Sequence, residues 1–146
     1  MIYHNILKNT WEGIIISKII SWKNFNEKMY KVFNKNFKYV DELYFNVKKE
    51  LFFGEENELE DMEALNYLKK LHEFSGELYI VTDVSYHKEL GPFLVDAKHI
   101  DEFVSNFYCN YGESFYSTDI IIVNFSKKLI WVLFHEGICW LTNANN

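Results

Sequence analysis

The chain has 146 residues, a formal net charge of −6 at pH 7 and a hydrophobic content of 49%. This length suits one domain spanning residues 1–146, and the composition is too apolar for a disordered chain. All 15 basic residues are lysines, and because arginine is the usual residue for bidentate recognition of phosphates and bases, we expect no direct binding to nucleic acid.

The first part of the chain predicts a helix that buries one face. Residues 13–20 form a short strand or the lead-in to this helix, and Ser21 is a suitable N-cap. Apolar side chains then recur every three or four residues, with lysines on the opposite face, which indicates a solvated basic side. The apolar positions are Trp22, Phe25, Met29 and Phe33, and the lysines are Lys28, Lys31, Lys35 and Lys38.

Two further helices are predicted between residues 40 and 76. The first follows from an apolar stripe over residues 40–51, with Gly54 as its C-cap. The second begins at the capping-box pattern of Asn57 and Glu60 and stops near residues 75–76. The stripe of the first helix consists of Val40, Leu43, Tyr44, Val47 and Leu51, and the second buries Ala64, Leu65, Leu68 and Leu71.

The rest of the chain predicts strands around one more helix. Residues 78–84 and the short run 92–95 are strand-like, and Asp96 can cap a helix that extends to about residue 107. Residues 119–125 and 129–134 form a predicted β-hairpin, and residues 138–141 extend it or add a strand.

The apolar runs near the C-terminus are continuous rather than alternating. We therefore expect central strands covered on both faces, with Ile121 and Trp131 among the most buried residues. The predicted fold is α+β, with a central, mainly antiparallel sheet, a C-terminal β-hairpin and about four packed helices.

No local pattern indicates a metal, a cofactor or a catalytic centre. The five histidines lack metal-ligand spacing, and His135 with Glu136 would point to opposite faces of a strand. Cys109 and Cys139 indicate buried packing in a reducing compartment. We expect no signal peptide, because no basic segment followed by an apolar core stands at the start of the sequence, and no apolar run reaches about 18 residues. We therefore expect a cytoplasmic protein that is not an enzyme and does not enter a membrane.

One enzymatic alternative depends on three residues. Asp83 ends a predicted strand, and Asp96 with Lys98 follows the next apolar run. An acid followed by an acid-x-Lys pattern is the Mg²⁺ site of PD-(D/E)xK nucleases, in which the carboxylates hold the ion and the lysine orients water. The competing interpretation is that Asp96 caps a helix and Lys98 is solvated.

Acidic and aromatic residues supply the candidate binding surface. Residues 1–49 carry a charge of +5 from nine lysines and four acids, and residues 50–146 carry −11 from six lysines and 17 acids. Dense carboxylates can fill a basic cleft of a partner, although acids at a helix start also complement its dipole. The acidic run includes Glu55, Glu56, Glu58 and Asp61, and the loops at strand ends add Asp83, Tyr86, Glu89, Tyr111, Glu113 and Tyr116.

From Glu77 onward, the order of strand, short loop and helix leads into YGESFYSTDIIIVNFSKKLIWVLFHEGICWL. This half of the chain, residues 77–142, resembles small immunity proteins of bacterial contact-dependent growth inhibition and related polymorphic toxin systems. The resemblance implies a partner, the C-terminal domain of a cognate toxin, often a nuclease, which the protein would block. A general interaction domain of the Smi1/Knr4-like type is the alternative binding function.

Overall fold

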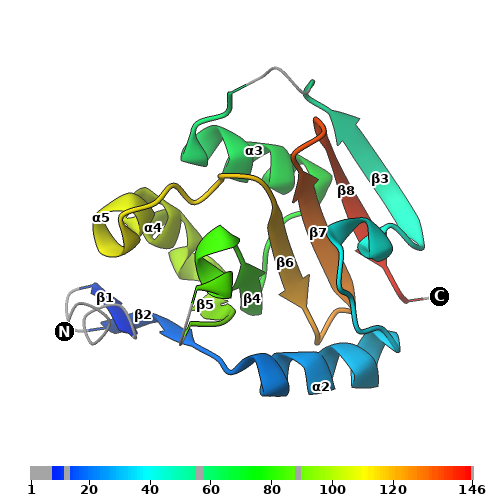
Figure 1. The fold of residues 1–146 in the computed structure, drawn as a ribbon, viewed down its shortest axis with the longest axis horizontal. Helices are drawn as coiled ribbons and strands as arrows, with labels where there is room; N and C mark the ends of the chain where they lie inside the picture. The colour runs from blue at the N-terminus through cyan, green and yellow to red at the C-terminus, as the bar shows by residue number, and fades with distance from the viewer. Residues whose placement is uncertain (1–7, 12–13, 55–57, 88–89, 146) are drawn as a thin grey trace.

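The computed structural model describes residues 8–11, 14–54, 58–87 and 90–145, which form one eight-stranded sheet with helices around it (Figure 1). The strands are β1 (Lys8–Trp11), β2 (Ile14–Ile19), β3 (Val47–Phe52), β4 (Glu77–Val81), β5 (Phe93–Asp96), β6 (Ile120–Asn124), β7 (Leu129–Phe134) and β8 (Ile138–Asn143). The helices are α2 (Trp22–Phe33), α3 (Asp61–Leu71), α4 (Ile100–Ser105) and α5 (Phe107–Tyr111). Three 3₁₀ turns are η1 (Val40–Leu43), η2 (Asp83–Tyr86) and η3 (Ala97–His99).

The strands lie in the order β1-β2-β5-β4-β6-β7-β8-β3, and every paired neighbour is antiparallel. The α+β prediction with a mainly antiparallel sheet is therefore confirmed. β1 and β3 are the outermost strands of this sheet. β3 carries Lys48 and Lys49, both exposed, and charged side chains of this kind protect an edge strand against pairing with other chains.

Both faces of the central strands are covered, as their continuous apolar runs predict. Successive residues of β6 alternate between two cores: Ile120 and Ile122 pack with residues of α3, α4 and α5, whereas Ile121 and Val123 pack with residues of α2. In Figure 1, α2 lies at the bottom of the view and α3 and α4 lie at the top and left, with the sheet between them.

The predicted C-terminal hairpin is confirmed. β6 and β7 pair from Ile120↔Leu133 to Asn124↔Leu129, and β8 pairs along the other side of β7. Ile121 is 1% exposed and Trp131 is 0% exposed, so both belong to the deepest part of the core.

The predicted first helix is also confirmed, and its N-cap is formed by Ser21, whose side chain accepts a hydrogen bond of 3.1 Å from the backbone nitrogen of Asn24. Of the four lysines predicted on the opposite face, Lys28, Lys31 and Lys38 are exposed and Lys35 is partly exposed. The Nζ atom of Lys28 lies 5.9 Å from the ring centres of both Tyr79 and Phe125, so this side chain packs over aromatic rings.

The second predicted helix, over residues 40–51, is wrong. Residues 40–43 form the short turn η1, and Val47–Phe52 form strand β3, which pairs with β8 through Glu50↔Trp140 and Leu51↔Cys139. Pairing with a strand almost 90 residues later overrides a local helical stripe, because packing partners decide the structure of a short segment.

Several boundaries also differ from the prediction. Glu60 with Glu63 forms the capping box of α3, whereas Asn57 lies outside the described residues. The strand predicted over residues 78–84 ends at Val81 and gives way to η2, and the fourth predicted helix is divided into η3, α4 and α5. His135 and Glu136 lie in the turn between β7 and β8, not on a strand.

Among the parts of the chain that the structure describes, no helix has the length and apolar character required to span a bilayer.

Candidate functional site

A cleft of about 560 Å³ opens at one end of the central strands. Val81↔Ile121 and Ile120↔Leu133 are paired residues, so the end of β4, the start of β6 and the end of β7 meet at the same edge of the sheet. Segments from four parts of the chain therefore supply its walls. The lining residues are Lys38, Tyr39, Val40, Asp41, Asp83, Tyr86, Thr118, Asp119, Phe134 and His135.

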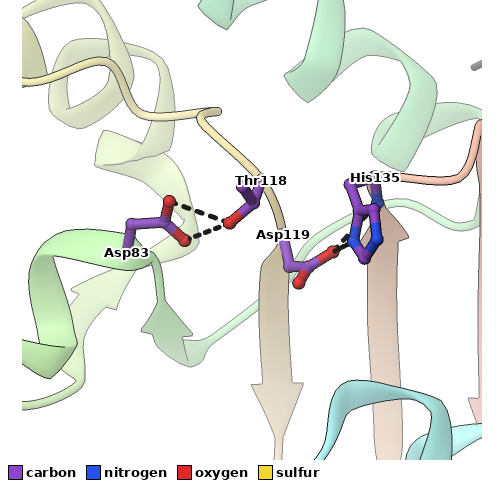
Figure 2. A network of polar contacts seen from close by, with 4 residues as sticks. All are labelled: Asp83, Thr118, Asp119 and His135. Atoms are coloured by element: carbon purple, nitrogen blue, oxygen red, sulfur yellow. Dashed lines mark hydrogen bonds and ion pairs between the residues drawn. The ribbon is translucent and has the colours of Figure 1, made fainter.

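Asp83 is the first residue of η2, two residues after the end of β4, and its carboxylate faces Thr118 (Figure 2). The Thr118 hydroxyl lies 2.6 Å from Oδ1 and 2.8 Å from Oδ2 of Asp83. A hydroxyl has a single proton, so it donates to one of these oxygens at a time and leaves acceptor capacity on the carboxylate. This contact holds the chain before β6 against the chain after β4.

Asp119 immediately precedes β6 and binds the turn after β7. Its Oδ1 atom accepts a hydrogen bond of 2.9 Å from the backbone nitrogen of His135 and lies 3.1 Å from Nδ1 of the same residue. The other carboxylate oxygen of Asp119 is turned away from His135 in Figure 2. Within the described residues, no hydrogen bond to this second oxygen is formed, and it can accept one from a ligand.

Threonine, aspartate and histidine are residue types of hydrolytic relays, but these residues do not form one. The Thr118 hydroxyl donates to Asp83, whereas His135 contacts Asp119. A nucleophile and its base must lie within hydrogen-bond reach of each other. The arrangement is better suited to accepting hydrogen bonds and positive charge than to activating a nucleophile.

Two exposed tyrosines flank the carboxylates. Tyr39 is 63% exposed and Tyr86 is 57% exposed. The Tyr86 ring stacks on Trp22 with ring centres 5.1 Å apart, and Trp22 is held by its Nε1 bond of 3.1 Å to the Ser85 carbonyl. The pKa of Tyr86 is raised, first by the partial burial of its side chain and then by the charges of Asp119 and Asp83.

The wall formed by Tyr39 is fixed by Glu42. One carboxylate oxygen of Glu42 accepts hydrogen bonds of 2.6 Å from the backbone nitrogens of Lys38 and Tyr39. These two backbone donors lower the pKa of Glu42, and nearby lysines lower it further. The Lys38 Nζ atom lies 5.6 Å from the Tyr39 ring centre, so a positive charge of the protein itself already rests on one aromatic wall.

The acidic run that the sequence singles out is only partly within the described structure. Glu55 and Glu56 lie outside the described residues, and Glu58 is exposed. Asp61 has a structural task, because its carboxylate accepts hydrogen bonds of 2.9 Å and 3.1 Å from the backbone nitrogens of Phe115 and Tyr116. Glu58 and Asp61 line a separate hollow of about 710 Å³ beside Tyr108.

Only some of the six loop residues that the sequence predicts as a binding surface line the cleft. Of this group, Asp83 and Tyr86 line the cleft, and Glu89 lies outside the described residues. Glu113 pairs with His87 at 3.1 Å. The other two are only partly exposed: Tyr111 packs on Phe93 and Phe107, and Tyr116 packs edge-on against Phe53.

The residues of the nuclease alternative are not brought together. Asp96 pairs with Glu77, the first residue of β4, whereas Asp83 lies two residues beyond the last residue of that strand. The length of β4, about 13 Å, separates the two positions, and ligands of one Mg²⁺ ion must each lie about 2 Å from it. Asp96 instead caps η3 through a 3.0 Å bond from the Lys98 nitrogen. The described residues contain no group of three or more histidine, cysteine, aspartate or glutamate side chains that could hold a metal ion.

Sequence reasoning missed Tyr39, Asp41, Thr118, Asp119 and His135 as partners of Asp83 and Tyr86. A usable signal was present for two of them. Asp119 is the first residue of the predicted hairpin and His135 immediately follows the last one, and the two outer ends of a hairpin lie side by side. No comparable signal in the sequence connects Tyr39 with the other cleft residues, because η1 reaches the cleft only through tertiary packing.

No protein-family model matches this chain, and comparison with curated proteins and with solved structures gives no match.

Proposed function

We propose that this protein is an immunity protein, which binds a cognate bacterial toxin domain and neutralises it by covering its active site. A nuclease is the toxin class that the sequence resemblance favours. The protein itself catalyses no reaction in this proposal, and its work is binding alone.

The observation that carries the proposal is the composition of the cleft rim. Two exposed tyrosines, Tyr39 and Tyr86, stand beside three carboxylates, Asp41, Asp83 and Asp119. Tyrosine is enriched at the centres of protein interfaces, where it buries a large area with few rotatable bonds. A nuclease must hold a polyanion, so its cleft is basic and complements an acidic surface.

Behind the cleft, aromatic rings form a packed cluster around the buried Trp140. Phe134, a lining residue, has its ring centre 5.9 Å from that of Trp140, and Tyr44 lies 5.2 Å from Trp140. Tyr44 is exposed and its hydroxyl donates a 2.7 Å hydrogen bond to Glu50. These packed contacts restrain the side chains near the cleft rim, and side chains restrained before binding lose less entropy on association.

The direct test is coexpression with the product of the neighbouring open reading frame. We expect a stable complex on co-purification, and we expect the protein to protect cells that express the toxin domain. The general interaction domain would bind a partner without restoring growth. A protein that neither binds nor protects against the adjacent toxin domain contradicts the proposal.

Binding kinetics test which surface is used. The variant Tyr86→Ala should speed dissociation of the complex, because desolvated aromatic anchors mainly set the dissociation rate. Tyr30→Ala is the matched control, since Tyr30 is 59% exposed on α2 and does not line the cleft. Reversal of Glu55, Glu56 and Glu58 to lysine tests the acidic run separately, because loss of steering should slow association and weaken its salt dependence.

The absence of catalysis is tested independently. Purified protein should leave RNA and DNA intact with Mg²⁺, Mn²⁺ or Zn²⁺ present. Metal-dependent cleavage that disappears in the Lys98→Ala variant would overturn the binding function in favour of the nuclease alternative.

A further inference from the structure

We infer that the cleft between η1, η2 and the β6–β7 hairpin receives one basic side chain of the partner protein, an arginine, with its guanidinium between Tyr39, Tyr86 and the carboxylates of Asp83 and Asp119. This inference rests on the proposed function, because it names the chemical group that the partner presents.

The charge of the cleft favours a cation. Its lining contains three aspartates and one lysine, with His135 as a further titratable group. Asp83 and Asp119 approach the cleft from the starts of η2 and β6, and their charges both act on the Tyr86 hydroxyl. The second oxygen of Asp119 has no hydrogen bond within the described structure, and Asp83 retains acceptor capacity beside Thr118.

The aromatic walls favour an organic cation over a metal ion. Tyr86 is braced by its stacking on Trp22, so its ring offers a fixed face to the cleft. A guanidinium is planar, stacks on aromatic rings and donates two parallel hydrogen bonds to a carboxylate. The volume of about 560 Å³ lies within the usual range of ligand pockets, whereas the described residues lack a metal-binding group of His, Cys, Asp and Glu side chains.

Lys38 provides an internal test of this assignment. Its ammonium lies 5.6 Å from the Tyr39 ring centre and it lines the same cleft. An incoming guanidinium therefore meets a like charge, which the partner must displace or tolerate. Removal of the Lys38 charge should strengthen binding of a cation, whereas removal of an aspartate charge should weaken it.

The experiment uses the full chain and a small probe, N-acetyl-arginine N-methylamide, followed by two-dimensional NMR. We expect saturable shifts at the amides of Tyr39, Tyr86, Thr118 and His135 in the millimolar range. The citrulline analogue, which has nearly the same shape and no charge, should produce no saturable shifts. The lysine analogue should bind more weakly than the arginine probe, because its ammonium does not stack or bind in a bidentate manner.

Four variants test in which direction the affinity for the arginine probe changes. Asp83→Asn and Asp119→Asn keep a hydrogen-bond acceptor for Thr118 and His135. Each should lower the affinity for the arginine probe by roughly two- to fivefold. Tyr86→Leu should lower the affinity for this probe by a similar factor, and Lys38→Gln should raise it. The matched control is Glu77→Gln, which removes one charge at the opposite end of β4 and should leave affinity unchanged.

Shifts that are equal for arginine and citrulline, or a Glu77→Gln effect as large as that of Asp83→Asn, would overturn the assignment. Failure of the probe leaves the toxin test intact, because co-purification and growth protection are measured without it. If the toxin binds normally to Asp83→Asn and Asp119→Asn variants, only the assignment of the cleft is wrong.

Discussion

The indole nitrogen of Trp140 donates a 3.0 Å hydrogen bond to the backbone carbonyl of Leu43, and so fastens the η1 turn to strand β8. The Thr142 hydroxyl lies 3.1 Å from the same carbonyl. All three residues are buried. The cleft wall formed by Tyr39 is part of the segment held in this way, so the stability of the β8 contacts and the shape of the cleft are connected.

The variant Trp140→Phe is expected to lower the free energy of unfolding by about 1–2 kcal/mol, because it keeps most of the ring and removes the N–H donor. Trp140→Ala should cost more, about 3–5 kcal/mol, because it also leaves a cavity. Urea denaturation followed by circular dichroism measures both changes. A Trp140→Phe variant as stable as the parent would show that the hydrogen bond to Leu43 contributes nothing, and equal losses for the two variants would show that the remaining ring adds nothing.

Residues 40–51, which were predicted as one helix, show that local periodicity carries no information on long-range strand pairing. Val40, Leu43, Val47 and Leu51 repeat at helical spacing, yet Leu43 lies in a turn and Val47 and Leu51 in a strand. The pairing of β3 with β8 is a long-range contact that no local window contains. In contrast, the hairpin was readable because its two apolar runs are adjacent in the chain and separated by a short turn.

The variant Asp61→Ala is expected to lower the free energy of unfolding by about 2–3 kcal/mol, because the backbone nitrogens of Phe115 and Tyr116 lose a charged acceptor. Glu58→Ala is the control, since an exposed acid away from such contacts changes stability by less than about 0.5 kcal/mol. Urea denaturation of both variants measures the two changes in the free energy of unfolding. If Asp61→Ala unfolds at the same urea concentration as the parent, the carboxylate does not support this loop.

The two cysteines should react at different rates with Ellman's reagent. The expectation of buried packing is wrong for Cys109, which is exposed, whereas Cys139 is 0% exposed in β8. Burial raises the pKa of the Cys139 thiol to about 11. We expect one reactive thiol per chain at pH 8 in the native protein and two in denaturant. A Cys109→Ser variant should show no rapid reaction unless it is unfolded, and rapid labelling of that variant would contradict the burial of β8.

Alkaline pH should destabilise the protein partly through Tyr111. Burial raises its pKa in the folded protein to about 12, against an ordinary value of 10.0. The folded state thus keeps a proton that the unfolded state loses above pH 10, and stability falls as the pH rises from about 10 to about 12. At pH 11 this loss is about 1 kcal/mol.

The Tyr111→Phe variant lacks this titration and should lose less stability than the parent between pH 8.5 and pH 11. Urea midpoints at the two pH values measure the difference, and other groups that titrate contribute equally to both proteins. Identical pH-dependent losses would show that the Tyr111 hydroxyl is not protected by the fold.

The candidate site was predictable only in part, for a physical reason. Asp83 and Tyr86 follow a strand, a position where functional side chains collect on a rigid scaffold, and both line the cleft. Asp61 also has the residue type of a surface acid, yet its carboxylate is directed at the backbone of residues 115 and 116. The sequence shows which side chains carry charge, but their hydrogen-bond partners depend on how the loops fold back.

The position of β3 at the rim of the sheet has a consequence for biosynthesis. Its partner β8 lies about 90 residues later in the chain, and at about 5–20 residues per second a ribosome needs roughly 5–20 s to make that stretch. During this interval β3 cannot form its native pairing. The unpaired β3 segment carries the charged residues Lys48, Lys49 and Glu50, and this charge limits its aggregation with other nascent chains.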